Sequence, residues 1–203
     1  YTGSEEEVVT PKTIDGHPVT RLEGTFRQPE PEQENAAQTS AQAEDAAKQQ
    51  ENQQGIRTIT VSEGVEYVDG YTFANLSTLE EVSLPSTLKQ VNGYTFEGLK
   101  NLKSVTLQEG LETIKTEAFK GTGIETLVLP ETVTAIEARA FQSEALKEIT
   151  VPESVTRIGS QAFSADTGLT IYTTMNSTAA VYAGLNNIHV VYTDYVDVEQ
   201  VTL

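Results

Sequence analysis

The side chains that most often carry out catalysis are few in this chain and lie far apart. Among its 203 residues there are two histidines, His17 and His189, and no cysteine. A histidine that acts as a general acid or base needs a partner within hydrogen-bond reach, and no recognisable motif supplies one near either residue. We interpret His17 as part of a turn and His189 as an exposed strand residue, and we predict no catalytic residue. The absence of cysteine also excludes disulfides and thiolate metal sites.

Carboxylates are numerous but are not spaced as a metal site. Glu80-Glu81 and Glu5-Glu6-Glu7 are adjacent in sequence, and no calcium-loop motif of the form D-x-[DN]-x-[DN]-G occurs. We predict no metal and no cofactor. Thirty acidic residues against thirteen basic ones give a net charge of -17, which disfavours nucleic acid and anionic membranes as partners. No run of 18 apolar residues is present, so we expect no membrane span in this stretch.

Phenylalanine returns at a nearly fixed interval and reveals the elements that position every other side chain. Phe73, Phe96, Phe119, Phe141 and Phe163 are separated by 23, 23, 22 and 22 residues. Each ends an apolar frame, L-x-x-V-x-L-x(3)-L-x-x-V-x(4)-F, whose clearest copy is Leu79, Val82, Leu84, Leu88, Val91 and Phe96. A period in the twenties is typical of a leucine-rich-repeat solenoid, in which each repeat is one coil.

One coil is too small to fold by itself, so the coils must stack. Six buried apolar side chains contribute roughly 1.5–3 kcal/mol each, whereas ordering each residue of the coil costs about 1.5 kcal/mol. Alternation of apolar and polar residues around Val82-Ser83-Leu84 predicts one strand per coil and a parallel sheet on the concave face. Pro85, Pro130 and Pro152 end these strands. Without helical periodicity, we expect mostly turns and short strands on the convex face.

The frame resembles the BspA-type leucine-rich repeat of bacterial surface proteins over about residues 56–192. The pattern L-x-x-V-x-L-P-x-x-L-x-x-V-x-x-x-x-F carries the resemblance, with Ala before Phe119, Phe141 and Phe163. Residues 8–22 with Phe26 resemble the opening unit of the family. Departures are Tyr71-Thr72 and Tyr94-Thr95, which replace the usual small residue before Phe. The resemblance implies an extracellular or cell-surface location, with adhesion to extracellular matrix components in some relatives.

An insertion of about 24 residues interrupts the first repeat. Residues 27–55 are rich in Gln, Ala and Glu and contain no aliphatic residue larger than Ala, so they cannot add to the core. A helix over residues 41–54, with Thr39 and Gln42 as a capping box, is one interpretation. A disordered flap is the other. We favour a partly helical excursion without a function of its own.

The other end of the chain predicts a cap. Residues 177–187 form a short helix with Asn176 or Ser177 as N-cap, and His189–Tyr192 resembles the family's final strand. We expect the exposed flank of the last coil to be covered by Ala180, Val181, Tyr182 and Leu185. The leucine-rich-repeat domain then spans residues 1–192 with its cap at 177–192. Residues 193–203 are a linker or the start of a following domain.

Outward strand residues form two predicted columns on the concave face. One column is Thr60, Ser83, Thr106, Val128, Thr150 and Thr170, and the other is Thr58, Glu81, Ser104, Thr126 and Glu148. A structural interpretation is sufficient, because Thr favours strands and its hydroxyl can pair with a stacked neighbour. The functional alternative is a shallow, hydroxyl-rich groove for a protein or glycan ligand.

Tyrosines form a second candidate surface. Tyr71 and Tyr94 hold the same position, two residues before Phe, in adjacent coils, and Tyr67 extends the patch. Exposed tyrosines are typical interface anchors, although the rings could simply cover the edge of a coil.

Two functions fit these patterns. The first is a non-enzymatic, monomeric interaction module on a bacterial surface that binds host or microbial proteins or glycans. The second is a structural stalk or spacer that displays a neighbouring domain.

Overall fold

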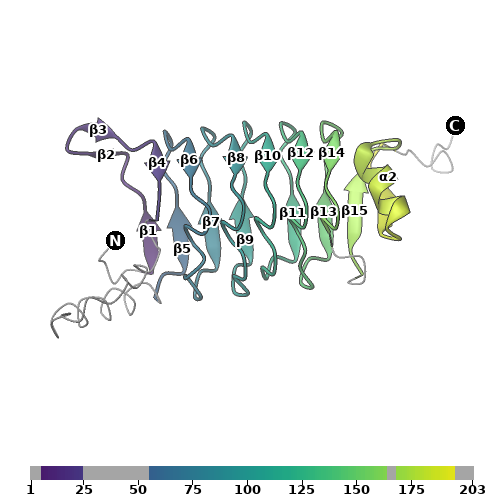
Figure 1. Ribbon diagram of the computed structural model, residues 1–203, viewed down its shortest axis with the longest axis horizontal. Helices are drawn as coiled ribbons and strands as arrows, with labels where there is room; N and C mark the ends of the chain where they lie inside the picture. Colours follow the sequence, from purple (N-terminus) through teal and green to yellow (C-terminus); the bar gives the residue numbers. More distant parts are fainter. Residues whose placement is uncertain (1–5, 25–54, 164–167, 195–203) are drawn as a thin grey trace, which may run out of the picture.

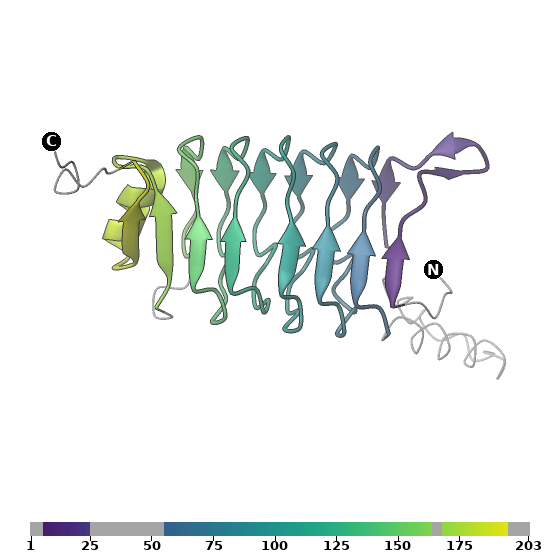
Figure 2. The ribbon, with the colours of Figure 1, turned by 180° about the vertical axis from the view of Figure 1, so that it is seen from behind.

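The computed structural model describes residues 6–24, 55–163 and 168–194, which wind into a β-solenoid closed by one short helix. Each coil from β1 (Glu7–Val9) to β14 (Arg157–Ile158) contributes one strand to each of two walls that run along the solenoid (Figures 1 and 2). The fold class predicted from the repeat is therefore confirmed. We call the wall with the longer strands, predicted as the concave sheet, the main wall.

The main wall holds β1 (Glu7–Val9), β5 (Thr58–Thr60), β7 (Glu81–Ser83), β9 (Ser104–Thr106), β11 (Thr126–Val128), β13 (Glu148–Thr150), β15 (Thr170–Thr173) and β16 (His189–Tyr192). The opposite wall holds β4 (Arg21–Leu22), β6 (Tyr67–Val68), β8 (Gln90–Val91), β10 (Thr113–Ile114), β12 (Ala135–Ile136) and β14 (Arg157–Ile158). All pairs within both walls are parallel and in the register of the repeat, as in Val82 beside Val105. Turns join the walls, as the lack of helical periodicity predicted.

The repeated phenylalanines form one continuous column inside the solenoid. Consecutive rings from Phe73 to Phe163 are stacked, with centroids 5.1–5.6 Å apart and interplanar angles of 14° or less. The departures at Thr72 and Thr95 fit this column. Their side chains are buried, and their hydroxyls donate to the carbonyl oxygens of Asp69 and Asn92 at 2.7 and 2.8 Å. A threonine is therefore tolerated where later coils have alanine.

Within residues 55–163 the hydrogen-bonded ladder of the main wall is interrupted at one place, between β9 and β11. Its strands form two sheets, in the orders β1-β5-β7-β9 and β11-β13-β15-β16, whereas β8, β10, β12 and β14 pair without a break behind the interruption. The interruption coincides with a change in turn length. Ser104 lies eight residues after Phe96, but Thr126 lies seven after Phe119. The coils are thus joined through the opposite wall and the core but separated between β9 and β11.

The two ends of the solenoid are closed differently. At the N-terminal end, β2 (Thr13–Ile14) and β3 (His17–Pro18) form an antiparallel hairpin. Its turn residues Asp15 and Gly16 both have positive φ, as tight hairpin turns of the mirror-image type require. The predicted insertion at 27–55 falls almost entirely outside the described residues, as do all residues after Asp194.

At the C-terminal end, α2 (Thr178–Leu185) covers the last coil (Figure 1), as predicted. The hydroxyl of Ser177 accepts from the Ala180 N–H at 3.1 Å, which confirms Ser177 as the N-cap. The predicted covering face was wrong in part, because Val181 and Leu185 are 59% and 81% exposed. The helix instead buries Ala179 and Ala183, and the Tyr182 ring meets Phe163 edge-on at 5.7 Å.

Candidate functional site

The ten residues predicted for the exposed face all lie on the main wall, and none of them is buried. Strand register confirms both predicted columns across β5, β7 and β9 and again across β11 and β13, where Thr126 lies beside Glu148 and Val128 beside Thr150. The placement of Thr170 was wrong. Thr170 pairs with Glu148 and belongs to the second column, and Tyr172 takes the place beside Thr150. The error arose because the last coil replaces the spacing L-x-x-V with Leu169-x-Ile171.

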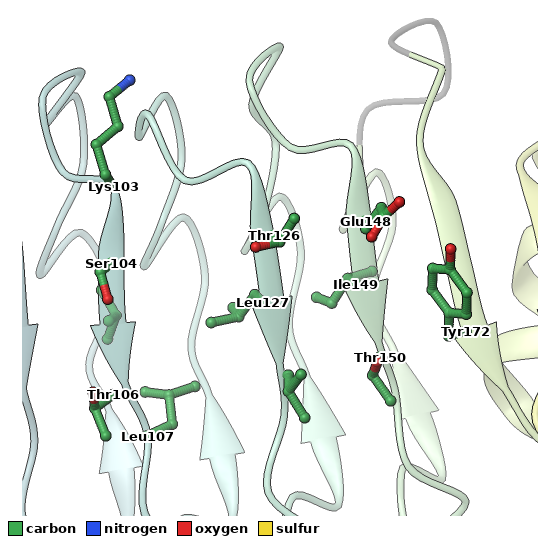
Figure 3. Close-up of a pocket in the computed structure, with 12 residues that line it drawn as sticks. Lys103, Ser104, Thr106, Leu107, Thr126, Leu127, Glu148, Ile149, Thr150 and Tyr172 are labelled. Carbon is green, nitrogen blue, oxygen red and sulfur yellow. The ribbon is translucent and has the colours of Figure 1, made fainter.

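Six of the ten predicted residues line one groove of about 850 Å³ that covers β9, β11 and β13. They are Ser104, Thr106, Thr126, Val128, Glu148 and Thr150. Sequence reasoning missed Lys103, Leu107 and Tyr172, which also line it (Figure 3). The other four lie on β5 and β7, which pair with each other without a gap; they are Thr58, Thr60, Glu81 and Ser83. The structure therefore divides the predicted face into a groove and a regular sheet.

Backbone groups on both sides of the interruption lack a strand partner. Elsewhere on the main wall the residue after each strand donates to the next coil, as in Leu84 N–H to Thr106 O at 3.0 Å and Leu129 N–H to Thr150 O at 3.1 Å. Within residues 55–163 no equivalent bond joins Leu107 to Val128, and none joins β9 to β11 at all.

The direction of the unpaired backbone groups follows from the hydrogen bonds that β9 and β11 make along their opposite edges. Parallel strands direct successive residues to alternate neighbours. Ser104 and Thr106 bond to the coil of β7, so the N–H and C=O groups of Val105 face the interruption. Glu125 and Leu129 bond to the coil of β13. The N–H and C=O groups of Thr126 and Val128 therefore face the interruption from the side of β11.

The groove contains two apolar side chains that are not buried, Val128 and Leu107. Val128 is 69% exposed, and Val9, which holds the same column position on β1, is 68% exposed, while the column residues between them, Thr60, Ser83 and Thr106, carry hydroxyls. Leu107 is only half-buried, although its equivalents Leu84 and Leu129 are fully buried. Figure 3 shows the side chains of Leu107 and Leu127 directed into the space between β9 and β11. The interruption thus leaves Leu107 partly exposed, whereas the equivalent residues of the neighbouring coils are buried.

The tyrosine edge is a separate surface. Tyr71 and Tyr94 stack at 4.9 Å with an interplanar angle of 4°, as their common position in the repeat predicted. Tyr67 lies on β6 of the opposite wall, and its ring is covered by the guanidinium of Arg21 at 4.0 Å. Burial first, and then the hydrogen bond to Asp69, raises the pKa of Tyr67.

A family comparison agrees with this geometry. The model of the BspA-type leucine-rich repeat region matches six copies across residues 50–179, which is more than half of the chain. The chain belongs to the BspA-type leucine-rich repeat family. No functionally curated protein matches the sequence.

Solved structures share the fold of this BspA-type solenoid. The T. pallidum leucine-rich repeat protein TpLRR has a TM-score of 0.58 at 17% identity, over 83% of this chain and 80% of that one. The pneumococcal vaccine antigen PcpA has a TM-score of 0.57 at 20% identity, over 94% of this chain and 42% of that one. At these identities the likeness is one of fold.

In this chain the residue two positions before Phe has a left-handed backbone in every coil from Phe73 to Phe163. Tyr71, Tyr94, Glu117, Arg139 and Gln161 have φ values between +54° and +63°. Such a conformation is uncommon for residues other than Gly, and it directs five different side chains along one row. Sequence reasoning recognised the common position but not this backbone constraint, because no glycine marks it.

Charged residues continue the row after the tyrosines. Arg139 and Lys120 both bond to Glu117, at 3.1 and 2.6 Å, and Lys120 also reaches Glu97 at 3.1 Å. The hydrogen bond from Lys120 is the main cause that lowers the pKa of Glu117, and Arg139 adds to it against the opposing effect of burial. This cluster joins three adjacent coils and holds Glu117 ionised.

The histidines lie at opposite ends of the BspA-type domain, as predicted. His17 is exposed on β3 and His189 is exposed on β16. Within residues 6–24, 55–163 and 168–194, no three His, Asp or Glu side chains gather as a metal site. The one helix described in those residues is too short to cross a membrane.

Proposed function

We propose that this domain is a non-enzymatic interaction module of a bacterial cell-surface or secreted protein, which binds a host or microbial protein or glycan through the groove on its main wall. Membership of the BspA-type family, whose repeat is associated above with bacterial surface proteins, supports the location. Repeat solenoids commonly present extended surfaces to partners. The two histidines lie on β3 and β16, at opposite ends of the domain, and binding needs no catalytic pair.

The groove is the observation that carries this proposal. It combines an exposed apolar side chain, Val128, with hydroxyls of Ser104, Thr126 and Thr150 and one charge at each side, Lys103 and Glu148. A few convergent polar groups around apolar surface are typical of binding sites. Leu107 is partly exposed at the interruption, whereas its equivalents Leu84 and Leu129 are buried in the adjacent coils.

Binding of the purified domain to an array of matrix proteins, mucins and glycans tests the proposal. We expect at least one saturable ligand that Glu148→Lys weakens. Glu81→Lys is the matched control, because it makes the same charge change on the same wall but outside the groove. Tyr71→Ala with Tyr94→Ala tests the tyrosine edge as the alternative surface. Equal binding by all these variants would contradict a groove-directed function.

A stalk or spacer is the second candidate, and the continuous phenylalanine column favours it. Five stacked rings and unbroken pairing of β8 to β14 give the coils a regular axial arrangement. A folded domain that binds nothing in the array, and whose removal from its parent protein leaves the parent's binding intact, would support this role instead.

A further inference from the structure

We infer that the interruption between β9 and β11 receives an extended polypeptide segment of the partner, held by main-chain hydrogen bonds to the two strand edges. This inference rests on the proposed function and specifies the chemical class of the ligand. The segment has β-branched or aromatic residues at its centre and basic residues in its flanks.

The chemistry of the unpaired edges selects a polypeptide over a glycan. Val105 on one side, and Thr126 and Val128 on the other, present N–H and C=O groups at the spacing of a parallel ladder. A second polypeptide backbone repeats donors and acceptors at the same rise of about 3.3 Å per residue. A sugar hydroxyl array has no such repeat. Extended peptides add to exposed strand edges in this way in several recognition domains.

The interruption is not covered by this chain's own described residues. Many proteins protect exposed edges with charged side chains, proline or a covering element. Within β9 and β11 the outward residues Ser104, Thr106, Thr126 and Val128 include no charge and no proline, and the nearest lysine, Lys103, lies just before β9. The unbroken pairing of β8, β10, β12 and β14 behind it holds the two edges in place. The site is therefore preformed on a continuous wall.

Charge determines which segments are favoured. Among the described residues, Lys103 and Glu148 are the charged ones that line the groove, and they lie at the same end of it. The centre of the segment thus meets hydroxyls and the exposed Val128, which suit Val, Ile, Thr or Tyr. The chain as a whole carries a net charge of -17, so basic flanks would accelerate association and strengthen it at low salt.

The probe is an array of peptides of about 12 residues, each with a central Val/Thr/Ile/Tyr run and lysine flanks. Peptides of the same charge with Gly and Pro at the centre are the negative set. The best peptide is remade with its central amides replaced by esters, which removes N–H donors and keeps every side chain. We expect the ester replacements to lower its affinity about tenfold or more, and ester replacements in the flanks to have little effect.

A protein variant gives an independent measurement. Val128→Pro removes the N–H that faces the interruption and should lower the affinity about tenfold. The control Val128→Thr keeps the N–H and the branched side chain and should bind nearly as well. If Val128→Pro does not fold, the ester series still decides the question.

Each outcome has a defined meaning. Loss of binding in the ester peptides and in Val128→Pro supports main-chain recognition. Full binding by both would overturn the inference. If no strand-forming peptide binds but the array of proteins and glycans gives a ligand that Glu148→Lys weakens, the proposed function survives and the peptide inference fails. If neither array gives a ligand, both fail.

Discussion

Replacement of Phe119 by alanine tests whether the phenylalanine column holds the solenoid together. Phe119 is fully buried and stacks on both sides, against Phe96 at 5.1 Å and Phe141 at 5.3 Å. Truncation of a buried Phe costs about 3–5 kcal/mol through lost transfer energy and the cavity that remains. Each lost ring pair adds about 0.5–1.5 kcal/mol beyond the buried area. Because Phe119 loses two, we expect the upper part of this range, about 4–5 kcal/mol.

The free energy of unfolding is obtained from urea denaturation followed by circular dichroism, with the slope of the transition compared between variants. Phe119→Leu is the control, because it keeps a large apolar side chain and loses both ring pairs, and it should cost about 1–3 kcal/mol, clearly less than Phe119→Ala. A loss below about 1 kcal/mol for Phe119→Ala would refute a shared, close-packed column.

Three further predictions concern other parts of the chain. Gly123→Ala places a Cβ against the carbonyl oxygen of Lys100 and should destabilise the domain by about 1–3 kcal/mol. The Cβ of Gly184→Ala meets no neighbour, and this variant should stabilise α2 by about 0.5–1 kcal/mol. Thermal unfolding of both variants tests the two expectations. Because the pKa of Glu117 is lowered in the fold, its contribution to stability is present above its usual pKa of 4.5 and is lost as the pH falls through the lower folded value. Denaturation at successive pH values should show this acid loss in the wild type and less of it in Glu117→Gln. Deletion of residues 31–53 with a short Gly-Ser closure should leave the melting temperature within a few degrees, and a collapse would show that the insertion packs on the solenoid.

The fold was predictable because the same apolar pattern occurs in several copies along the sequence. Inward positions such as Val82, Val105 and Phe119 recur at one spacing, so an error in one copy is corrected by the others. The cap was less predictable, because α2 occurs once. Without repetition, Val181 and Leu185 could not be distinguished from the covering residues Ala179 and Ala183 by apolar character alone.

The groove was predicted only as an undivided face. Its column residues follow from strand alternation, but the separation of β9 from β11 depends on how two neighbouring coils fit together, which a pattern within one coil does not contain. A signal was present in the shortening of the turn between Phe119 and Thr126. The same limit applies to Tyr172, whose place beside Thr150 depends on the irregular start of the last coil.

The change in turn length also bears on how such a chain can evolve. It divides the coils into an earlier block, with eight residues from Phe to the next main-wall strand, and a later block with seven. Duplication of a unit within either block adds a coil that matches its neighbours and creates no second interruption. Descendants of this gene could therefore vary in length while they retain a single groove at the boundary between the blocks.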